Sequence, residues 1–295
     1  MSNRKYEIME RIGHGAFGNI YKARNRNSGE LVAMKFETHV APLQKSMLKN
    51  EAFIYQYLRQ YDCFPHLKWY GIDAEGTKFL VMTLLGPSLE DVMRDRHFAP
   101  LPLPAVVDIG ARIVSIIQIV HDNHLLHRDI KPDSILFGRE DTVEASHLFL
   151  IDFGLGKPYV ENDQHIPFRP TTGFIGSYHY ASRNAHTHVE LSRRDDLESV
   201  IYLLLFLLWG TLPWKNATPD VSLAWKRRVM HLQCPDLPDP LRACIRHVQS
   251  LAFPSRPNYA LLLAALRGFL AGGAGTTDSP TATATEEEEE EGGAA

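Results

Sequence analysis

Two short segments near the middle of the chain each contain an aspartate, and their residue types can catalyse the transfer of a phosphoryl group. In the first, 127–134, Asp129 can orient a hydroxyl and accept its proton. Lys131, two residues later, can stabilise negative charge on a phosphate during transfer. The second string is 152–154 (Asp-Phe-Gly), directly after an apolar run, and the Asp152 carboxylate is a hard oxygen ligand suited to Mg²⁺. Together they indicate phosphoryl transfer.

A glycine-rich string, 13–18, stands near the start of the chain. Its G-x-G-x-x-G spacing also occurs in dinucleotide-binding folds, where the turn must open a helix. Here it leads into 19–24, which alternates like a strand. We therefore expect a hairpin whose backbone N–H groups approach phosphate oxygens. The expected nucleotide-binding residues of this string are Gly13, Gly15, Phe17 and Gly18. A glycine-rich hairpin without a ligand remains the alternative.

Lys35 ends the apolar string Val-Ala-Met-Lys on a predicted strand. A buried lysine needs an anionic partner, which a phosphate or a nearby carboxylate would supply. Glu51 has the right position, because the predicted helix 43–59 places it on the face it shares with Met47 and Ile54. The alternatives are a surface lysine whose amine reaches solvent and a solvated glutamate.

The hydrophobic periodicity gives a β-rich first third followed by helices, an α+β pattern in two lobes. We expect one catalytic domain over residues 1–270, with an N-terminal lobe of about 1–84 and a C-terminal lobe of about 85–270. The predicted strands are 6–12, 19–24, 31–36 and 79–84, and the predicted helices are 43–59, 105–123, 197–209, 243–253 and 259–270.

The composition is that of a globular protein, with 44% apolar and 22% charged residues among 295. The formal charge of −4 gives no reason to expect a nucleic acid or a membrane as a partner, and the apolar run 200–209 is too short to span a bilayer. The three cysteines show no metal-ligand spacing, and the first residues lack a signal peptide.

The last 25 residues, 271–295, have a composition that predicts disorder. They contain several threonines, then the run Glu286–Glu291, and they include seven acidic residues and no basic one. A solvating end is the favoured interpretation. A tail that folds back as a pseudosubstrate, or that is autophosphorylated, is the alternative.

Lys35, Glu51, Asp129 and Asp152 occur in the order typical of eukaryotic protein kinases, and the sequence resembles that superfamily. Within it, the chain is most similar to the casein kinase I family over about residues 4–270. The segments that carry this resemblance are 85–91 (LGPSLED), 165–169 (HIPFR), 180–184 (YASRN, where the family has Ser-Ile-Asn), 191–199 (LSRRDDLES) and 255–259 (SRPNY).

The resemblance implies a bilobal fold with ATP between the lobes. It implies an adenine pocket, a gatekeeper at Met82, and adenine contacts from the backbone of Thr83 and Leu85. It also implies that Asp196 braces the catalytic loop and that Ser177 lies beside Asp129. The apolar residues of the adenine pocket would be Ile12, Ile20, Ala33, Leu136 and Ile151.

The function implied by the resemblance is that of a serine/threonine protein kinase. ATP and Mg²⁺ would be needed, with Mn²⁺ as an alternative metal, and the substrates would be proteins bearing Ser or Thr. A monomer in the cytoplasm, the nucleus or both is expected. A pseudokinase that serves as an ATP-binding or interaction module is the alternative, and a small-molecule kinase is a third.

The chain departs from the family at two functional places. Ser134 replaces an asparagine that holds a second Mg²⁺, so we expect Asp152 and Ser134 as metal ligands, with weakened binding at the serine. Thr172 and His179 replace basic residues that read a phosphate already present on the substrate. Neither is a permanent cation, which makes a preference for primed substrates doubtful.

Overall fold

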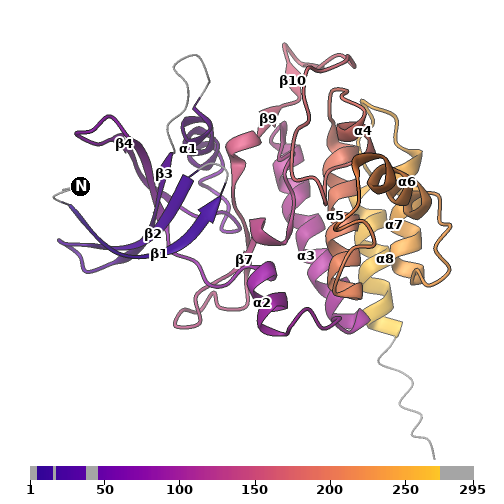
Figure 1. Cartoon of the computed structure of the whole chain (residues 1–295), viewed down its shortest axis with the longest axis horizontal. Helices are drawn as coiled ribbons and strands as arrows, with labels where there is room; N and C mark the ends of the chain where they lie inside the picture. Colours follow the sequence, from indigo (N-terminus) through magenta and orange to yellow (C-terminus); the bar gives the residue numbers. More distant parts are fainter. Residues whose placement is uncertain (1–4, 16–17, 38–45, 273–295) are drawn as a thin grey trace, which may run out of the picture.

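The structure is a computed structural model that describes residues 5–15, 18–37 and 46–272. A β-rich part and a helical part lie side by side, with α2 and β7 at the boundary between them (Figure 1). This arrangement confirms the predicted α+β pattern in two lobes. The division at residues 84 and 85 stays a prediction. Residues 271 and 272 of the predicted tail are helical, and residues 273–295 lie outside the described residues.

The β-rich part is an antiparallel five-stranded sheet in the order β1-β2-β3-β5-β4. The helix α1 (Met47–Tyr57) begins at Ser46, whose hydroxyl accepts a hydrogen bond from the Lys49 N–H. The strands are β1 (Tyr6–Gly15), β2 (Gly18–Asn25), β3 (Leu31–Glu37), β4 (Leu67–Ile72) and β5 (Lys78–Thr83).

The two faces of β3 serve different purposes. Successive strand residues point to opposite faces, so Val32 and Met34 pack into a small cluster of the sheet itself. Ala33 points the other way and joins the main core, which continues through α1 into the helical part. Lys35, two residues after Ala33, therefore faces the helical part.

The helical part is built around α5 (Arg193–Trp209), which is buried from Asp195 to Leu207. The other helices are α2 (Leu89–Asp95), α3 (Leu103–Asp122), α4 (Arg183–His186), α6 (Pro219–Met230), α7 (Asp239–Ser250) and α8 (Tyr259–Gly272), with the short turns η1 (Pro132–Ser134) and η2 (Phe153–Leu155). The short strands are β6 (Leu125–Leu126), β7 (Ile135–Phe137), β8 (Leu148–Leu150), β9 (Lys157–Pro158), β10 (Val160–Glu161) and β11 (Gln164–His165).

By length and composition, α3 is the one helix of the described part that could cross a membrane, with a mean hydropathy of 1.8. It packs instead against α5 and α8. Its buried residues include Val107, Ile113 and Ile117, each 0% exposed. A core helix of a globular domain has the same composition.

Several predicted boundaries were wrong. The helix predicted from Leu197 begins at Arg193, because Asp195 in its first turn accepts a hydrogen bond from the Ser192 N–H at 2.8 Å. The helix α7 begins at Asp239, four residues before the predicted start at 243. Met47 is 37% exposed, so it does not share the buried face of Glu51 and Ile54. The strand β4 and the helices α2 and α6 were not predicted at all.

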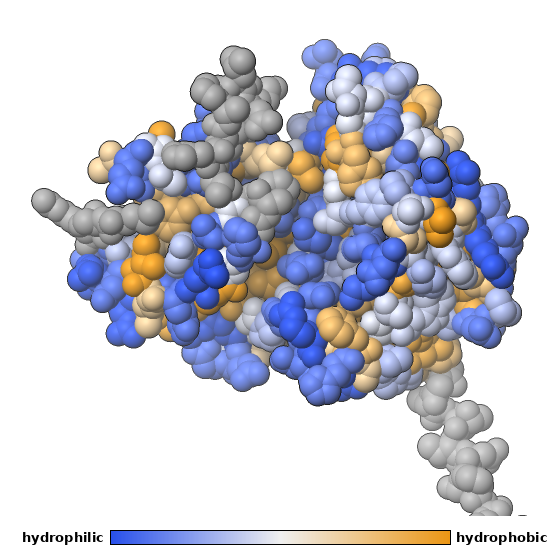
Figure 2. Space-filling view, in the orientation of Figure 1, coloured by the Kyte–Doolittle hydropathy of each residue, from blue (hydrophilic) through white to orange (hydrophobic). Residues whose placement is uncertain are grey.

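Hydrophilic residues predominate on the face shown in Figure 2, and the hydrophobic ones form small separate groups. The large apolar side chains are instead collected in the core around Trp214, Tyr202 and Phe153, which are each 0% exposed. The fold therefore presents its charged groups on a rigid, well-packed frame.

Candidate active site

The predicted ion pair forms at the boundary between the two parts. The Lys35 Nζ lies 2.7 Å from the Glu51 Oε2 and 2.8 Å from the Asp152 Oδ1. The Lys35 and Glu51 side chains are only 6% and 1% exposed, whereas Asp152 is 17% exposed. One cation thus joins β3, α1 and the Asp-Phe-Gly string, which are far apart in the sequence.

The charges of this cluster follow from its contacts. Burial alone would lower the pKa of Lys35, but Glu51 and Asp152 outweigh burial and raise it, so the lysine is cationic. Burial alone would raise the pKa of Asp152, but the Lys35 ammonium outweighs it and holds that pKa below its usual value. Asp152 is therefore ionised, as a metal ligand must be.

Two residues that sequence reasoning missed hold this cluster in place. The Tyr55 hydroxyl donates to the Glu51 Oε1 at 3.0 Å and accepts from the Asp152 N–H at 3.0 Å. The Asn50 amide donates to the carbonyls of Phe153, Gly154 and Gly156 at 2.9–3.3 Å. Tyr55 lies one helical turn after Glu51, and that spacing is the only signal the sequence offered.

Asp129, Lys131 and Ser177 come together as predicted. The Lys131 Nζ lies 3.0 Å from the Asp129 Oδ2 and 3.3 Å from the Ser177 Oγ. Burial lowers the pKa of Lys131, but Asp129 outweighs it and the net shift is upward. The Asp129 Oδ1 is buried and has no hydrogen-bond partner in the described part of the chain. That oxygen is free to accept a proton from a substrate hydroxyl.

Gly176 allows the segment that carries Ser177 to approach the catalytic loop closely. Its φ is +99°, and a Cβ there would lie 2.7 Å from the Arg128 carbonyl oxygen and 3.7 Å from the Asp129 Oδ1. A side chain would therefore push the two segments apart.

Asp196 braces the catalytic loop, as the resemblance implied. Its carboxylate accepts hydrogen bonds from the His127 and Arg128 N–H groups, each at 2.8 Å, and from the His121 Nε2 at 3.0 Å. Burial raises the pKa of Asp196, but the hydrogen bond and charge of His121 outweigh burial and lower it. The brace is therefore a fully satisfied, ionised carboxylate inside the core.

The residues present fit a magnesium ion held largely by a nucleotide. Asp152 offers an ionised carboxylate, and no group of three His, Cys, Asp or Glu residues that could hold a metal alone occurs among the described residues. Mg²⁺ is commonly held by one or two carboxylates together with substrate phosphates. Ser134 is 0% exposed, and its hydroxyl donates to the Asp129 carbonyl oxygen at 3.2 Å. The serine therefore ties down the catalytic loop, which is one of the two roles that the family's asparagine has at this position.

The five-stranded sheet brings three residues of the predicted adenine pocket, Ile20, Ala33 and Met82, onto one face. Ile20 pairs with Lys35, and Ala33 pairs with Met82, so these side chains share one sheet face. Thr83 donates its N–H to the His66 carbonyl oxygen at 3.1 Å, while its side-chain oxygen accepts from the His66 N–H.

The other predicted nucleotide-binding residues lie in three places. Leu136 pairs with Ser88 beside the segment that contains Leu85, and Ile151 donates its N–H to the Ser134 carbonyl oxygen. Ile12 is 48% exposed on the edge strand β1, at a register shift between Arg11 and Gly13. Gly13, Gly15 and Gly18 lie on the β1–β2 hairpin, and Phe17 lies outside the described residues.

The activation segment, 152–182, is held by an internal carboxylate. Glu190 is only 3% exposed and lies 2.8 Å from the Lys157 Nζ and 3.3 Å from the Arg169 Nε. The Arg128 Nε donates to the Leu155 carbonyl oxygen at 2.7 Å. Three basic residues of the catalytic loop and activation segment are therefore engaged without a phosphate.

Thr172 and His179 occupy the segment that would contact a substrate. Thr172 is exposed. The pKa of His179 is lowered by burial and then by Lys226 and Lys215, so the ring is neutral at pH 7. Neither residue supplies a cation.

Lys226 is a further residue that the sequence did not reveal. It is 0% exposed, and its ammonium donates to the Tyr178 and Ala181 carbonyl oxygens at 2.8 and 2.7 Å. It thereby fixes the segment after Ser177 to α6. Burial lowers its pKa to about 7, although Glu198 opposes the shift.

We expect this lysine to make stability depend on pH. An unfolded lysine keeps its proton up to about pH 10.5, whereas folded Lys226 releases it near 7. The unfolded state binds more protons in that window, so the free energy of unfolding rises with pH relative to Lys226→Met. Urea titrations of both proteins across the window measure this. A constant difference between them would contradict the expectation.

A comparison with protein-family models agrees with this geometry. The model described as the protein kinase domain matches residues 6–251. The match includes Lys35, Glu51, Asp129 and Asp152, and it ends at the loop between α7 and α8.

Proposed function

The chain belongs to the protein kinase domain family, and we propose that it is a serine/threonine protein kinase of the casein kinase I type. The membership supports a phosphotransferase that uses ATP and acts on proteins. The observation that carries the finer proposal is the cluster of Asp129, Lys131 and Ser177, with an Asp129 oxygen free for a hydroxyl. A lysine and a serine beside the catalytic carboxylate suit a small aliphatic hydroxyl.

In the proposed mechanism, Asp129 orients the substrate hydroxyl and accepts its proton as the γ-phosphoryl group is transferred in line. Lys131 stabilises charge on the moving group, and Lys35 holds the phosphates that remain. Mg²⁺, when bound at Asp152 with the phosphates of ATP, would neutralise their charge.

The casein kinase I assignment rests on segments that have structural roles here. In LGPSLED, Ser88 and Asp91 form a reciprocal capping box that starts α2. In LSRRDDLES, Asp195 starts α5 and Asp196 braces the catalytic loop. These polar contacts, rather than generic core packing, support the resemblance.

We also propose that the kinase is active without phosphorylation of its activation segment. Glu190 already forms ion pairs with both Lys157 and Arg169 in a nearly buried position. A carboxylate supplied by the fold can do what a phosphate does elsewhere, which is to order the segment through basic residues. A monomer in the cytoplasm, nucleus or both is part of the same proposal.

Three peptides that differ only in carrying Ser, Thr or Tyr test the proposed specificity. With ATP and Mg²⁺ we expect phosphate transfer to the Ser and Thr peptides and to casein, but not to the Tyr peptide. Transfer to tyrosine would contradict the proposal. A folded protein that binds ATP but transfers phosphate to none of them would be a pseudokinase.

Restoring asparagine at position 134 should raise activity. The Ser134 hydroxyl donates its only proton to the Asp129 carbonyl oxygen. An asparagine side chain could donate an amide N–H to the same carbonyl and still offer its own oxygen to a metal. We expect Ser134→Asn to raise kcat by ~10–100-fold and to lower the Mg²⁺ concentration needed for half-maximal rate. Ser134→Ala is the matched variant that lacks both functions. An unchanged rate and metal requirement in Ser134→Asn would contradict this explanation.

A phosphate already present on the substrate should give little advantage. Thr172 and His179 leave the matching positions without a permanent cation, and the lowered pKa of His179 keeps its ring neutral at pH 7. We expect kcat/KM for a peptide with an upstream phosphoserine to stay within about threefold of the value for its unphosphorylated form. The double variant Thr172→Lys/His179→Arg should create the preference. A strong preference in the unchanged protein would show that other cations read the phosphate.

A further inference from the structure

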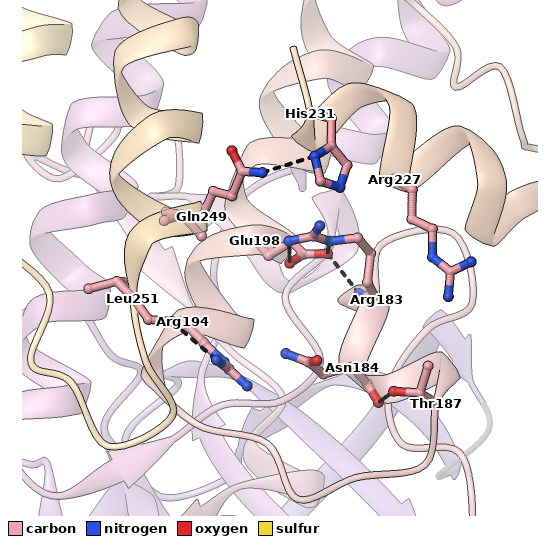
Figure 3. Close-up of a pocket in the computed structure, with 10 residues that line it drawn as sticks. Arg183, Asn184, Thr187, Arg194, Glu198, Arg227, His231, Gln249 and Leu251 are labelled. Atoms are coloured by element: carbon pink, nitrogen blue, oxygen red, sulfur yellow. Dashed lines mark hydrogen bonds and ion pairs between the residues drawn. The ribbon is translucent and has the colours of Figure 1, made fainter. Parts of the chain in front are cut away.

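A second pocket lies in the helical part, away from Asp129 and Lys35. It has a volume of about 280 Å³ and is lined from α4, α5, α6 and α7 and the residues next to them (Figure 3). Arg183, Arg194, Arg227 and His231 line it, and Glu198 is the only carboxylate among the lining residues. The pocket is therefore strongly basic.

The single carboxylate is already fully used. Glu198 accepts from the Arg183 Nε at 3.1 Å and its Nη2 at 3.2 Å, and from the Tyr202 hydroxyl at 2.7 Å. Its side chain is 4% exposed. The Arg183–Glu198 pair is thus close to neutral and leaves Glu198 little capacity to balance the other cations.

Arg194 and Arg227 lie on opposite sides of this pair (Figure 3). The Arg194 Nη1 donates to the Leu251 carbonyl oxygen at 3.1 Å. Its buried Nε has no hydrogen-bond partner among the described residues and forms a long ion pair with the Asp195 Oδ2 at 4.0 Å. The Arg227 guanidinium has no ion pair or hydrogen bond within the described part. Two arginines thus retain donors for an oxyanion, which planar guanidinium groups bind well.

The chain itself contains a matching anion. Thirteen residues, 273–285, separate the end of α8 at Gly272 from the run Glu286–Glu291. An extended chain of that length reaches about 45 Å. The helix α8 is only about 21 Å long. Its first residue, Tyr259, lies 2.6 Å from His121, which in turn contacts Asp196, two residues after Arg194. The run can therefore reach the pocket.

We propose that this pocket is a binding site for an acidic peptide segment and that its occupant is the chain's own Glu286–Glu291 run. Carboxylates of the run bind Arg194 and Arg227 on the two sides of the Arg183–Glu198 pair. The site is separate from Asp129 and Lys131, so the tail docks on the helical part without acting as a pseudosubstrate. The proposal does not depend on the residue that the kinase phosphorylates.

Binding of a fluorescein-labelled peptide of residues 276–295, followed by anisotropy at low salt, tests the site. The receptor is the full chain with Glu286–Glu291 all replaced by Gln, so that its own tail does not compete. We expect saturable binding that Arg227→Glu weakens at least tenfold. Arg228→Glu is the matched control, because Arg228 is the exposed neighbour that packs on Trp225 and does not line the pocket. We expect less than a twofold change there.

The unchanged full chain identifies the occupant. Its tethered run competes at high effective concentration, so the labelled peptide should bind at least fivefold more weakly than to the Gln-substituted chain. Equal binding to both chains would overturn the assignment of the tail. No binding, or equal weakening by Arg227→Glu and Arg228→Glu, would overturn the site. Circular dichroism checks that each variant is folded.

Discussion

Replacing Asp129 with asparagine is expected to lower kcat for phosphoryl transfer by about 10²–10⁴-fold and to leave the fold intact. The substitution keeps the size of the side chain and its contact with Lys131, which lies 3.0 Å from the Asp129 Oδ2. What it removes is the carboxylate whose Oδ1 is buried without a partner in the described part of the chain. An amide cannot accept the proton of the substrate hydroxyl.

Asp95→Asn is the matched control, because Asp95 is an exposed aspartate at the end of α2, outside the catalytic loop. Its kcat should stay within about twofold of the unchanged protein, since surface substitutions away from special features have small effects. The affinity for ATP should be the same in both variants. If Asp129→Asn retained more than a tenth of the rate, Asp129 would not be the general base.

The chemistry of the site could be predicted because each residue comes with a local pattern. Asp129 lies six residues after a predicted helix, Asp152 directly follows an apolar run, and Lys35 ends an apolar string on a predicted strand. The contact between Lys35 and Glu51 then follows from helix and strand periodicity together with the known order of these residues in kinases, whereas the contact of Lys35 with Asp152 was not predicted. Ser177 was placed only by the resemblance, because nothing in its neighbours fixes its distance from Lys131.

The residues that support the site could not be predicted, since their roles depend on tertiary contacts. Tyr55 looks like an ordinary core residue of α1 until the backbone of Asp152 is placed against it. Lys226 looks like a surface lysine on a polar helix, yet it is 0% exposed and is held by two backbone carbonyls. Glu190 gives no local signal, because its cations lie 21 and 33 residues away in the sequence.

The boundary errors have a similar physical origin. Periodicity located the buried stretch of α5 correctly, but polar residues at the start of the helix look like a loop. Asp195 and Asp196 are 3% and 2% exposed because the first caps the helix and the second binds the catalytic loop. The helix therefore begins before its apolar pattern does, because its first turn contains polar residues that are buried for structural and functional reasons.

Replacing Lys35 with methionine should have the largest effect on stability. The ammonium lies within 2.8 Å of two carboxylates, so its loss leaves Asp152 and the 1% exposed Glu51, whose pKa burial raises, facing each other without their cation. Breaking a buried ion pair from one side costs about 3–5 kcal/mol, and we expect a loss of that size in urea unfolding. Phosphoryl transfer should fall by at least ~100-fold, because the phosphates lose their cation.

The double variant Lys35→Met/Glu51→Gln separates the two effects. A glutamine at 51 carries no charge and can still bond with the Tyr55 hydroxyl, which lies 3.0 Å from the Glu51 Oε1. We expect the double variant to recover at least half of the lost stability and none of the lost activity. If it were no more stable than Lys35→Met, charge repulsion could not explain the destabilisation. If it regained activity, the lysine would act by folding the site and not by holding phosphate.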